Sequence, residues 1–211
     1  MVRIGSLLLC LLLLLPVFGV EAAGQYVAFV FETGDSPAAA LELSRLLEGR
    51  KAKITLLLGE NEKADPEKGQ ELALICPTEW NALTRLQVAR QLGQLQEQLP
   101  QDTAARWLSP RGSYSDSVRQ VAGAMGYSLL GPSKTGMNAP AALKLTNQVR
   151  SGDVIYMGKV NAPSVTALAN MMDILEKRGF QFVTVSELAS RQRIRPIPGE
   201  FYNTFRRKFP E

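Results

Sequence analysis

Four side chains in this sequence could do acid–base, nucleophilic or metal chemistry: Glu32, Asp35, Cys76 and Glu79. They would hold a metal ion only if the fold brought them to one point, because a metal needs its ligands at fixed distances. The 211 residues include no histidine, the commonest protein metal ligand and the side chain best suited to proton transfer near neutral pH. Without a histidine base, Cys76 is a weak candidate nucleophile. We therefore favour the interpretation in which Glu32 and Glu79 are solvated and Cys76 is a buried apolar residue.

The N-terminal residues have the composition of an export signal. Arg3 precedes an apolar run at 7–15, and the segment 20–23 offers small residues for cleavage. This run is too short for a membrane span, so it predicts a signal peptide over residues 1–23, with an uncleaved N-terminal anchor as the alternative. We expect the mature protein in the periplasm, in the cell envelope or outside the cell. Only Cys76 remains after cleavage, so residues 24–190 must fold around an ordinary hydrophobic core without an internal disulfide.

Residues 191–211 form a basic and aromatic tail. The tail holds six positive and two negative side chains, which account for the whole net charge of +4. Its stretch from Arg191 to Lys208 could contact an anionic wall polymer or membrane surface. The alternative is a solvated tail whose aromatic residues pack on the domain: Phe201, Tyr202, Phe205 and Phe209. We expect no nucleic-acid partner for an exported protein.

Short aliphatic runs alternate with amphipathic stretches along the rest of the chain. The runs predict strands at 26–31, 53–58, 72–76, 106–108, 127–130, 154–157 and 182–185. The stretches predict helices at 38–48, 81–99, 115–125, 141–148 and 164–178. Buried strands that alternate with helices pair in parallel with right-handed crossovers. About seven such units favour an α/β fold, a closed or nearly closed, distorted (β/α) barrel.

Four segments, in this order along the chain, resemble the polysaccharide deacetylase family, the NodB-like carbohydrate esterases. Residues 26–35 resemble the family's first strand, which ends in Thr-Phe-Asp-Asp-Gly, and residues 51–61 resemble its second strand. Residues 110–119 resemble the segment Arg-Pro-Pro-Tyr-Gly-Ser-Tyr-Asn, and residues 152–188 resemble the closing strand pair and its helix. The resemblance spans residues 25–190 and implies a site at the carboxyl ends of the barrel strands.

The resemblance also implies a degenerate site. Family enzymes bind zinc through one aspartate and two histidines and use a second aspartate as the base. Glu32 stands at the base position, whereas Thr33, Cys76 and Trp80 stand at the ligand positions. A neutral hydroxyl is a poor zinc ligand and an indole cannot bind zinc. Gly158 replaces the histidine that would protonate the leaving amine. We therefore predict no catalytic residue and no zinc cofactor in this chain.

The remaining rim residues suit contact with sugar. Trp80 could stack on a pyranose, and Arg111, Tyr114 and Asn138 could hydrogen-bond hydroxyl or anionic groups. The competing interpretation is that Trp80 fills the space of the lost metal site.

Three functions follow from these interpretations. The first is a non-catalytic protein that binds, or is a structural part of, envelope polysaccharide or peptidoglycan. The second is a divergent metal-dependent deacetylase of N-acetylated polysaccharide that uses Glu32 and Cys76. The third is a protein-interaction module that works through its basic tail.

Overall fold

The computed structural model describes residues 24–60, 62, 70–100, 106–137 and 139–206. The predicted signal peptide lies outside the described residues, and so does Asn138. Within the described part of the chain, no helix is long and apolar enough to cross a membrane.

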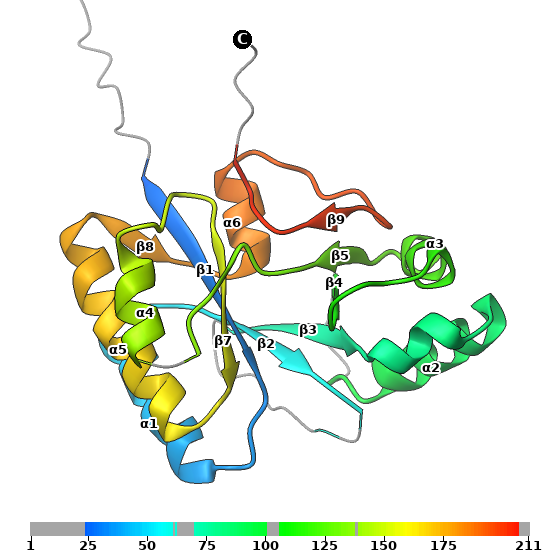
Figure 1. Ribbon diagram of the computed structural model, residues 1–211, viewed down its shortest axis with the longest axis horizontal. Coiled ribbons are helices and arrows are strands. Elements are labelled where there is room, and N and C mark those ends of the chain that lie inside the picture. Colours follow the sequence, from blue (N-terminus) through cyan, green and yellow to red (C-terminus); the bar gives the residue numbers. More distant parts are fainter. Residues whose placement is uncertain (1–23, 61, 63–69, 101–105, 138, 207–211) are drawn as a thin grey trace, which may run out of the picture.

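A curled sheet of parallel strands forms the centre of the molecule (Figure 1). Its strands follow the order β6-β7-β1-β2-β3-β4-β5-β9, and β8 pairs with β1. The bounds are β1 Gln25–Glu32, β2 Thr55–Leu58, β3 Glu71–Cys76, β4 Trp107–Pro110, β5 Ser128–Leu130, β6 Lys134–Thr135, β7 Val154–Lys159, β8 Phe180–Phe182 and β9 Phe201–Tyr202. The expected distorted (β/α) barrel is therefore confirmed.

Helices cover the outside of the barrel. Figure 1 shows α1, α4 and α5 on one side and α2 and α3 on the other. The bounds are α1 Pro37–Arg50, the 3₁₀ helix η1 Thr78–Ala82, α2 Arg85–Glu97, α3 Asp116–Ala124, α4 Ala139–Thr146, α5 Ala162–Lys177 and α6 Val185–Arg191. The residues of α6 pack in the inner apolar cluster, so this helix covers one end of the barrel.

Alternation along the strands divides the core into two clusters. In β1, Val27, Phe29 and Phe31 belong to the outer cluster, between the sheet and the helices. Ala28 and Val30 belong to the inner cluster. Successive side chains of a strand point to opposite faces, so Glu32 continues the inner series at the carboxyl end of β1. This alternation decides which strand residues point into the barrel and can reach a site at its mouth.

Helix capping explains why the bounds of two predicted elements were wrong. The single helix expected at 81–99 is split, because the Thr84 side chain accepts a hydrogen bond from the Gln87 backbone N–H and starts α2 anew. The strand expected at 182–185 ends at Phe182, because Thr184 caps α6 in the same way. The short elements β6, β9 and α6 were not predicted.

The tail is part of the barrel up to Arg206. Strand β9 pairs with β5, and the Phe205 ring is fully buried in the inner cluster. Thr204 forms an antiparallel bridge with Asp153, just before β7, and the Phe205 N–H donates to the Gly152 carbonyl over 2.7 Å. These contacts join the two ends of the curled sheet. Packing of the tail aromatics on the domain, one of the two alternatives for the tail, is therefore confirmed for Tyr202 and Phe205.

Candidate functional site

A buried carboxylate lies at the carboxyl ends of the barrel strands. Glu32 is 7% exposed, so the interpretation that it is solvated is wrong, and both of its oxygens accept hydrogen bonds. Arg111 Nη2 donates to Oε2 over 2.7 Å, and the Tyr156 hydroxyl donates to Oε1 over 2.6 Å. Burial and the Glu32 charge raise the pKa of Tyr156, so its hydroxyl remains a donor at neutral pH. Glu32 is thus held in place by two donors, one on each of its oxygens.

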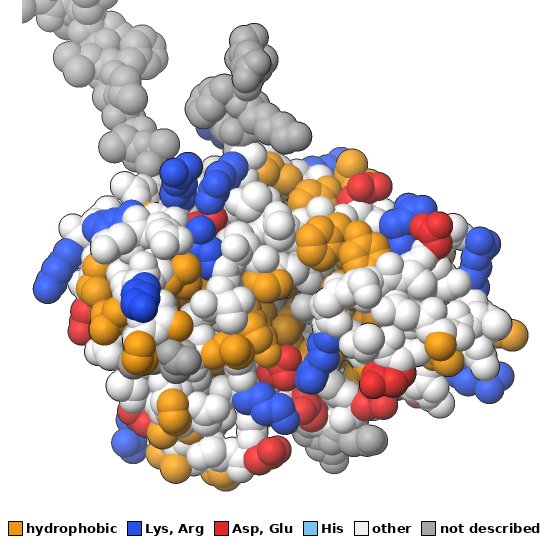
Figure 2. All heavy atoms as spheres, in the orientation of Figure 1, with side chains coloured by type: hydrophobic (Ala, Val, Ile, Leu, Met, Phe, Trp, Pro, Cys, Tyr) orange, Lys and Arg blue, Asp and Glu red, His pale blue; other side chains and the backbone are white. Residues whose placement is uncertain are grey.

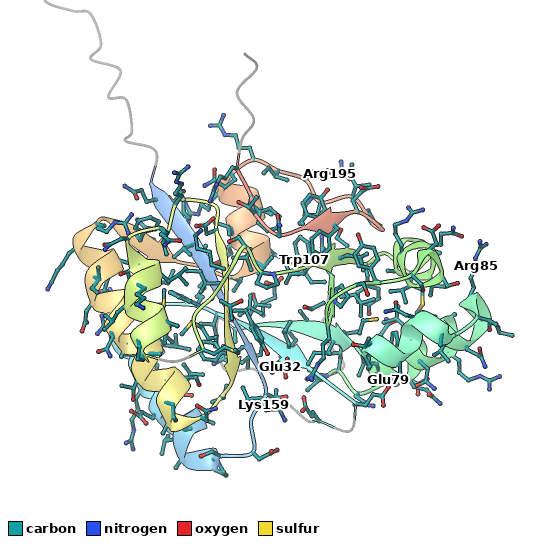
Figure 3. All side chains as sticks on the ribbon, in the orientation of Figure 1. Glu32, Glu79, Arg85, Trp107, Lys159 and Arg195 are labelled. Atoms are coloured by element: carbon teal, nitrogen blue, oxygen red, sulfur yellow. The ribbon has the colours of Figure 1, made fainter. Side chains whose placement is uncertain are left out.

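Two cations flank this carboxylate at the rim. Arg111 leaves the end of β4, and its side chain is 53% exposed. Lys159, the last residue of β7, is in register with Glu32 and exposed. Figure 3 shows Lys159 beside Glu32, and Figure 2 shows basic and acidic side chains gathered on this part of the surface. With the carboxylate of Glu62, which is bonded to Thr33, two positive and two negative side chains meet at this point.

A second carboxylate, from Glu62, occupies the position next to Thr33. The Thr33 hydroxyl donates a short hydrogen bond to Glu62 Oε2, and the Gly59 N–H donates to the same oxygen over 2.8 Å. The Thr33 backbone N–H donates to the Leu57 carbonyl, which fixes the residue against β2. The sequence reasoning missed Glu62; the one signal for it is its place directly after a strand that leads into the site. A carboxylate bound in this way fills the space beside Thr33.

Cys76 and Trp80 do not reach the site. Cys76 follows Leu72 and Leu74 in the outer series of β3, and both Cys76 and Trp80 lie in the outer cluster. Trp80 is 3% exposed, so neither face of its ring is open to a sugar. The prediction that Trp80 stacks on a pyranose is therefore wrong, because the ring packs into the hydrophobic core.

The acidic and thiol groups that the structure describes do not fit a zinc site. Asp35 and Glu79 are exposed, and Figure 3 shows Glu79 on the η1 side of the barrel mouth. Among the described residues, no three Cys, Asp or Glu side chains are close enough to hold a metal ion together. Convergence of Glu32, Asp35, Cys76 and Glu79 on one ion, the rival interpretation of the sequence, is therefore not found in this part of the chain.

Short hydrogen bonds from η1 hold the loop that carries Arg111 and Tyr114. The Thr78 hydroxyl donates to the Arg111 carbonyl over 3.0 Å. The Asn81 amide donates to the Ser113 carbonyl over 2.9 Å and accepts from the Ser115 N–H over 2.7 Å. Burial of Trp80 anchors η1 beneath this loop, so its ring acts indirectly by positioning the rim.

Tyr114 forms a small aromatic surface with the tail. Its ring stacks on Phe201, with centroids 5.6 Å apart and an interplanar angle of 25°. Phe201 is 41% exposed and Tyr114 is partly buried. Stacked, partly exposed rings present an apolar surface with a hydroxyl at its edge, which suits the mixed polarity of a sugar.

The buried thiol of Cys76 should be unreactive in the folded protein. Desolvation raises its pKa to about 12, so almost no thiolate is present near neutral pH. We expect a thiol reagent to label Cys76 at least about a hundredfold more slowly in buffer at pH 8 than in denaturant. The raised pKa also predicts that the stability contributed by the protonated thiol is complete below pH 9 and declines as the pH rises toward about 12. Labelling at similar rates in the two conditions would contradict the burial.

Solved structures of carbohydrate esterases share the fold of this chain. A deacetylase described as the T48 deacetylase with substrate has 18% identity and a TM-score of 0.73, covering 86% of this chain and 98% of its own. A family 4 acetyl xylan esterase from Clostridium thermocellum, in complex with cobalt, has 18% identity and a TM-score of 0.71, covering 85% and 98%. A mutant of a family 4 pseudoenzyme has 16% identity and a TM-score of 0.66, covering 78% and 67%.

No family model matches the sequence, and no curated protein is similar to it. The relation is therefore carried by the structure, and it agrees with the resemblance that the strand-end segments predicted. The chain has the fold of the family 4 polysaccharide deacetylases and carbohydrate esterases.

Proposed function

We propose that this protein is exported and binds an envelope polysaccharide or peptidoglycan without hydrolysing it. The rim formed by Arg111, Lys159 and Tyr114 is the binding surface. Neighbours with the same fold include deacetylases and a protein described as a pseudoenzyme, so the fold is compatible with both an active and a silent site. The export signal predicted at residues 1–23 supports a location where such glycans occur.

The lack of a ligand set around Glu32 is the observation that carries the proposal. In metal-dependent deacetylation, the rival function, a bound metal ion activates the attacking water. Among the described residues, no three Cys, Asp or Glu side chains, Glu32 included, are close enough to hold such an ion. Thr33 is a neutral residue bonded to Glu62, and Cys76 points into the outer core. Binding of a ligand needs none of the groups that are missing.

The exposed cations of the rim favour an acidic glycan, because Glu32 is buried and the Glu62 carboxylate is bonded to Thr33 and Gly59. The Arg111 guanidinium donates to Glu32 through Nη2, and its side chain remains half exposed. Its other N–H groups can therefore donate to an oxyanion. Lys159 adds a second positive charge beside it. Peptidoglycan lactyl or peptide carboxylates, or uronic acids, match this arrangement, whereas a neutral glycan gains nothing from it.

The basic tail contributes less to binding than its composition indicates. Arg206 is paired with the buried Asp153, and the Arg191 guanidinium lies 5.2 Å from the centre of the Tyr26 ring. These two cations are therefore engaged within the domain. The tail interpretation, with an anionic surface as partner, has weaker support than the rim.

Retention on purified peptidoglycan tests the proposal. Charge-assisted hydrogen bonds are worth about 1.5–3 kcal/mol, so Arg111→Gln should weaken retention about tenfold or more. Lys159→Gln should weaken it severalfold, and it leaves the Glu32 pair intact. Arg85→Gln removes an equal charge from the N-terminus of α2, which Figure 3 shows away from Glu32, and should retain full binding.

The rival deacetylase is tested with the same preparations. Release of acetate from peptidoglycan or chitooligosaccharides that stops when Glu32 becomes Gln, or when metal is chelated, would overturn the silent-site proposal. We expect no acetate release with the native chain in the presence of zinc or cobalt. Equal retention of the native chain and of Arg111→Gln would show that the rim is not the glycan site.

A further inference from the structure

A pocket of about 500 Å³ opens at the opposite end of the barrel from Glu32. Its walls come from the amino ends of β4 and β5, from α6 and from the tail segment 194–198. Figure 3 shows Arg195 on this side, Trp107 between the two ends, and Glu32 on the other side. The volume is within the range of about 300–1,000 Å³ usual for small-ligand sites. The pocket is therefore separate from the proposed glycan rim.

The pocket is preformed because its tail wall is hydrogen-bonded to the barrel at several points. The Ser128 hydroxyl donates to the Ile197 carbonyl over 3.0 Å, and the Gly199 N–H donates to the Tyr127 carbonyl over 2.8 Å. Pro196 and Pro198 restrict the backbone between these bonds and α6. A wall fixed in this way loses little entropy when a ligand binds.

The charge of the lining is positive and unbalanced. Arg106 and Arg195 line the pocket, and both are exposed. Among the described residues neither guanidinium has an ion pair, and none of the lining residues is acidic. The Glu71 carboxylate contacts the lining through Ser186; it accepts from Thr55 and from the hydroxyl and backbone N–H of Ser186. With this carboxylate counted, the two arginines still leave the pocket positive.

The polar and apolar groups beside the arginines complete a small-molecule site. Ser190 is exposed and lines the pocket, whereas Trp107, whose N–H donates to Ser186 over 2.9 Å, is 1% exposed and supports the wall from beneath. Arginine recognises carboxylate and phosphate oxygens through parallel N–H donors, and two arginines line this pocket. The exposed Ser190 hydroxyl can bond a hydroxyl group of the ligand beside them.

We propose that this pocket binds a small oxyanion-bearing saccharide, whose carboxylate or phosphate is held by Arg106 and Arg195. The proposal is independent of the glycan rim. It assigns a second, anion-selective site to the closed end of the barrel, in contact with the tail that joins the edges of the sheet.

Calorimetric titration with glucose 6-phosphate, glucuronic acid and glucose tests the site and distinguishes the two oxyanions. We expect saturable binding of at least one anion at millimolar concentration and no comparable binding of glucose. The double variant Arg106→Gln/Arg195→Gln should weaken that binding about tenfold or more. Both side chains are exposed, so the double variant should have the same unfolding temperature as the native chain. A thermal scan measures both temperatures.

Two matched variants locate the effect. Arg85→Gln and Arg45→Gln each remove a charge elsewhere on the surface, from α2 and from α1; both should bind the anion within about twofold of the native chain. Equal weakening by Arg85→Gln would show a non-specific charge effect and overturn the proposal. Failure of both anions to bind, or binding of glucose as tight as theirs, would also overturn it, whatever the result on peptidoglycan.

Discussion

Replacing Phe205 with alanine is expected to lower the free energy of unfolding by about 3–5 kcal/mol. The ring is 0% exposed, stacks on Tyr202 and meets Trp107 edge to face, with both centroids 5.6 Å away. Truncation would leave a cavity between rigid rings that cannot collapse into it. Urea denaturation followed by tryptophan fluorescence measures the loss, because Trp107 is in direct contact with the deleted ring.

Phe201→Ala is the matched control, since it removes the same side chain from the same tail. Phe201 is 41% exposed and packs mainly on Tyr114, so we expect a loss of about 1 kcal/mol or less. A loss of about 1 kcal/mol or less in both variants would show that residues 201–206 add little to the stability of the domain. The expected difference instead makes them part of the folded domain, beyond the boundary at residue 190 that the sequence favoured.

Ion pairing between the tail and Asp153, just before β7, explains why the tail matters to the fold. Asp153 is fully buried and is paired with Arg206, while Lys134 Nζ lies 3.8 Å from its other oxygen. The Arg150 N–H donates to that same oxygen over 2.9 Å. A buried carboxylate needs such partners because its desolvation is costly when it stands alone. The basic composition of the tail therefore has a structural use at Arg206.

The sequence predicted the barrel because its strands are apolar on both faces. Runs such as 26–31 and 72–76 have no solvent-facing side, which is typical of parallel strands covered by helices. The order of the strand-end segments predicted the same architecture. Short pairs such as β6 and β9 carry two residues each and no periodicity, so no pattern could have revealed them.

The site was harder to predict because it depends on strand parity and on distant pairs. The sequence placed Glu32 at the barrel mouth, and the structure agrees. The resemblance aligned Cys76 and Trp80 with ligand positions there, but β3 turns Cys76 outward and Trp80 is buried in η1. The favoured interpretation of Cys76 as a buried apolar residue is confirmed. The partners of Glu32 are 79 and 124 residues away along the chain, at Arg111 and Tyr156. No local pattern encodes such pairs.

The loop after β1 links the stability of the barrel to the geometry of the rim. The Val160 N–H donates to the Glu32 carbonyl over 3.0 Å, which continues the pairing of β1 with β7 to the mouth. Gly34 lies directly beyond, and a Cβ atom there would come within 2.0 Å of the Val160 carbonyl oxygen. That oxygen belongs to the backbone and cannot rotate away as a side chain could.

Gly34→Ala is therefore expected to lower the free energy of unfolding by about 2–4 kcal/mol and to weaken glycan retention. Gly49→Ala is the control: a Cβ there would meet nothing within 4 Å, and α1 should gain up to about 1 kcal/mol from the better helix former. Urea titration and the peptidoglycan assay measure both effects. Because the clash displaces β7 where it carries Lys159 beside Glu32, loss of stability without loss of retention would separate the rim from this loop and place glycan binding elsewhere.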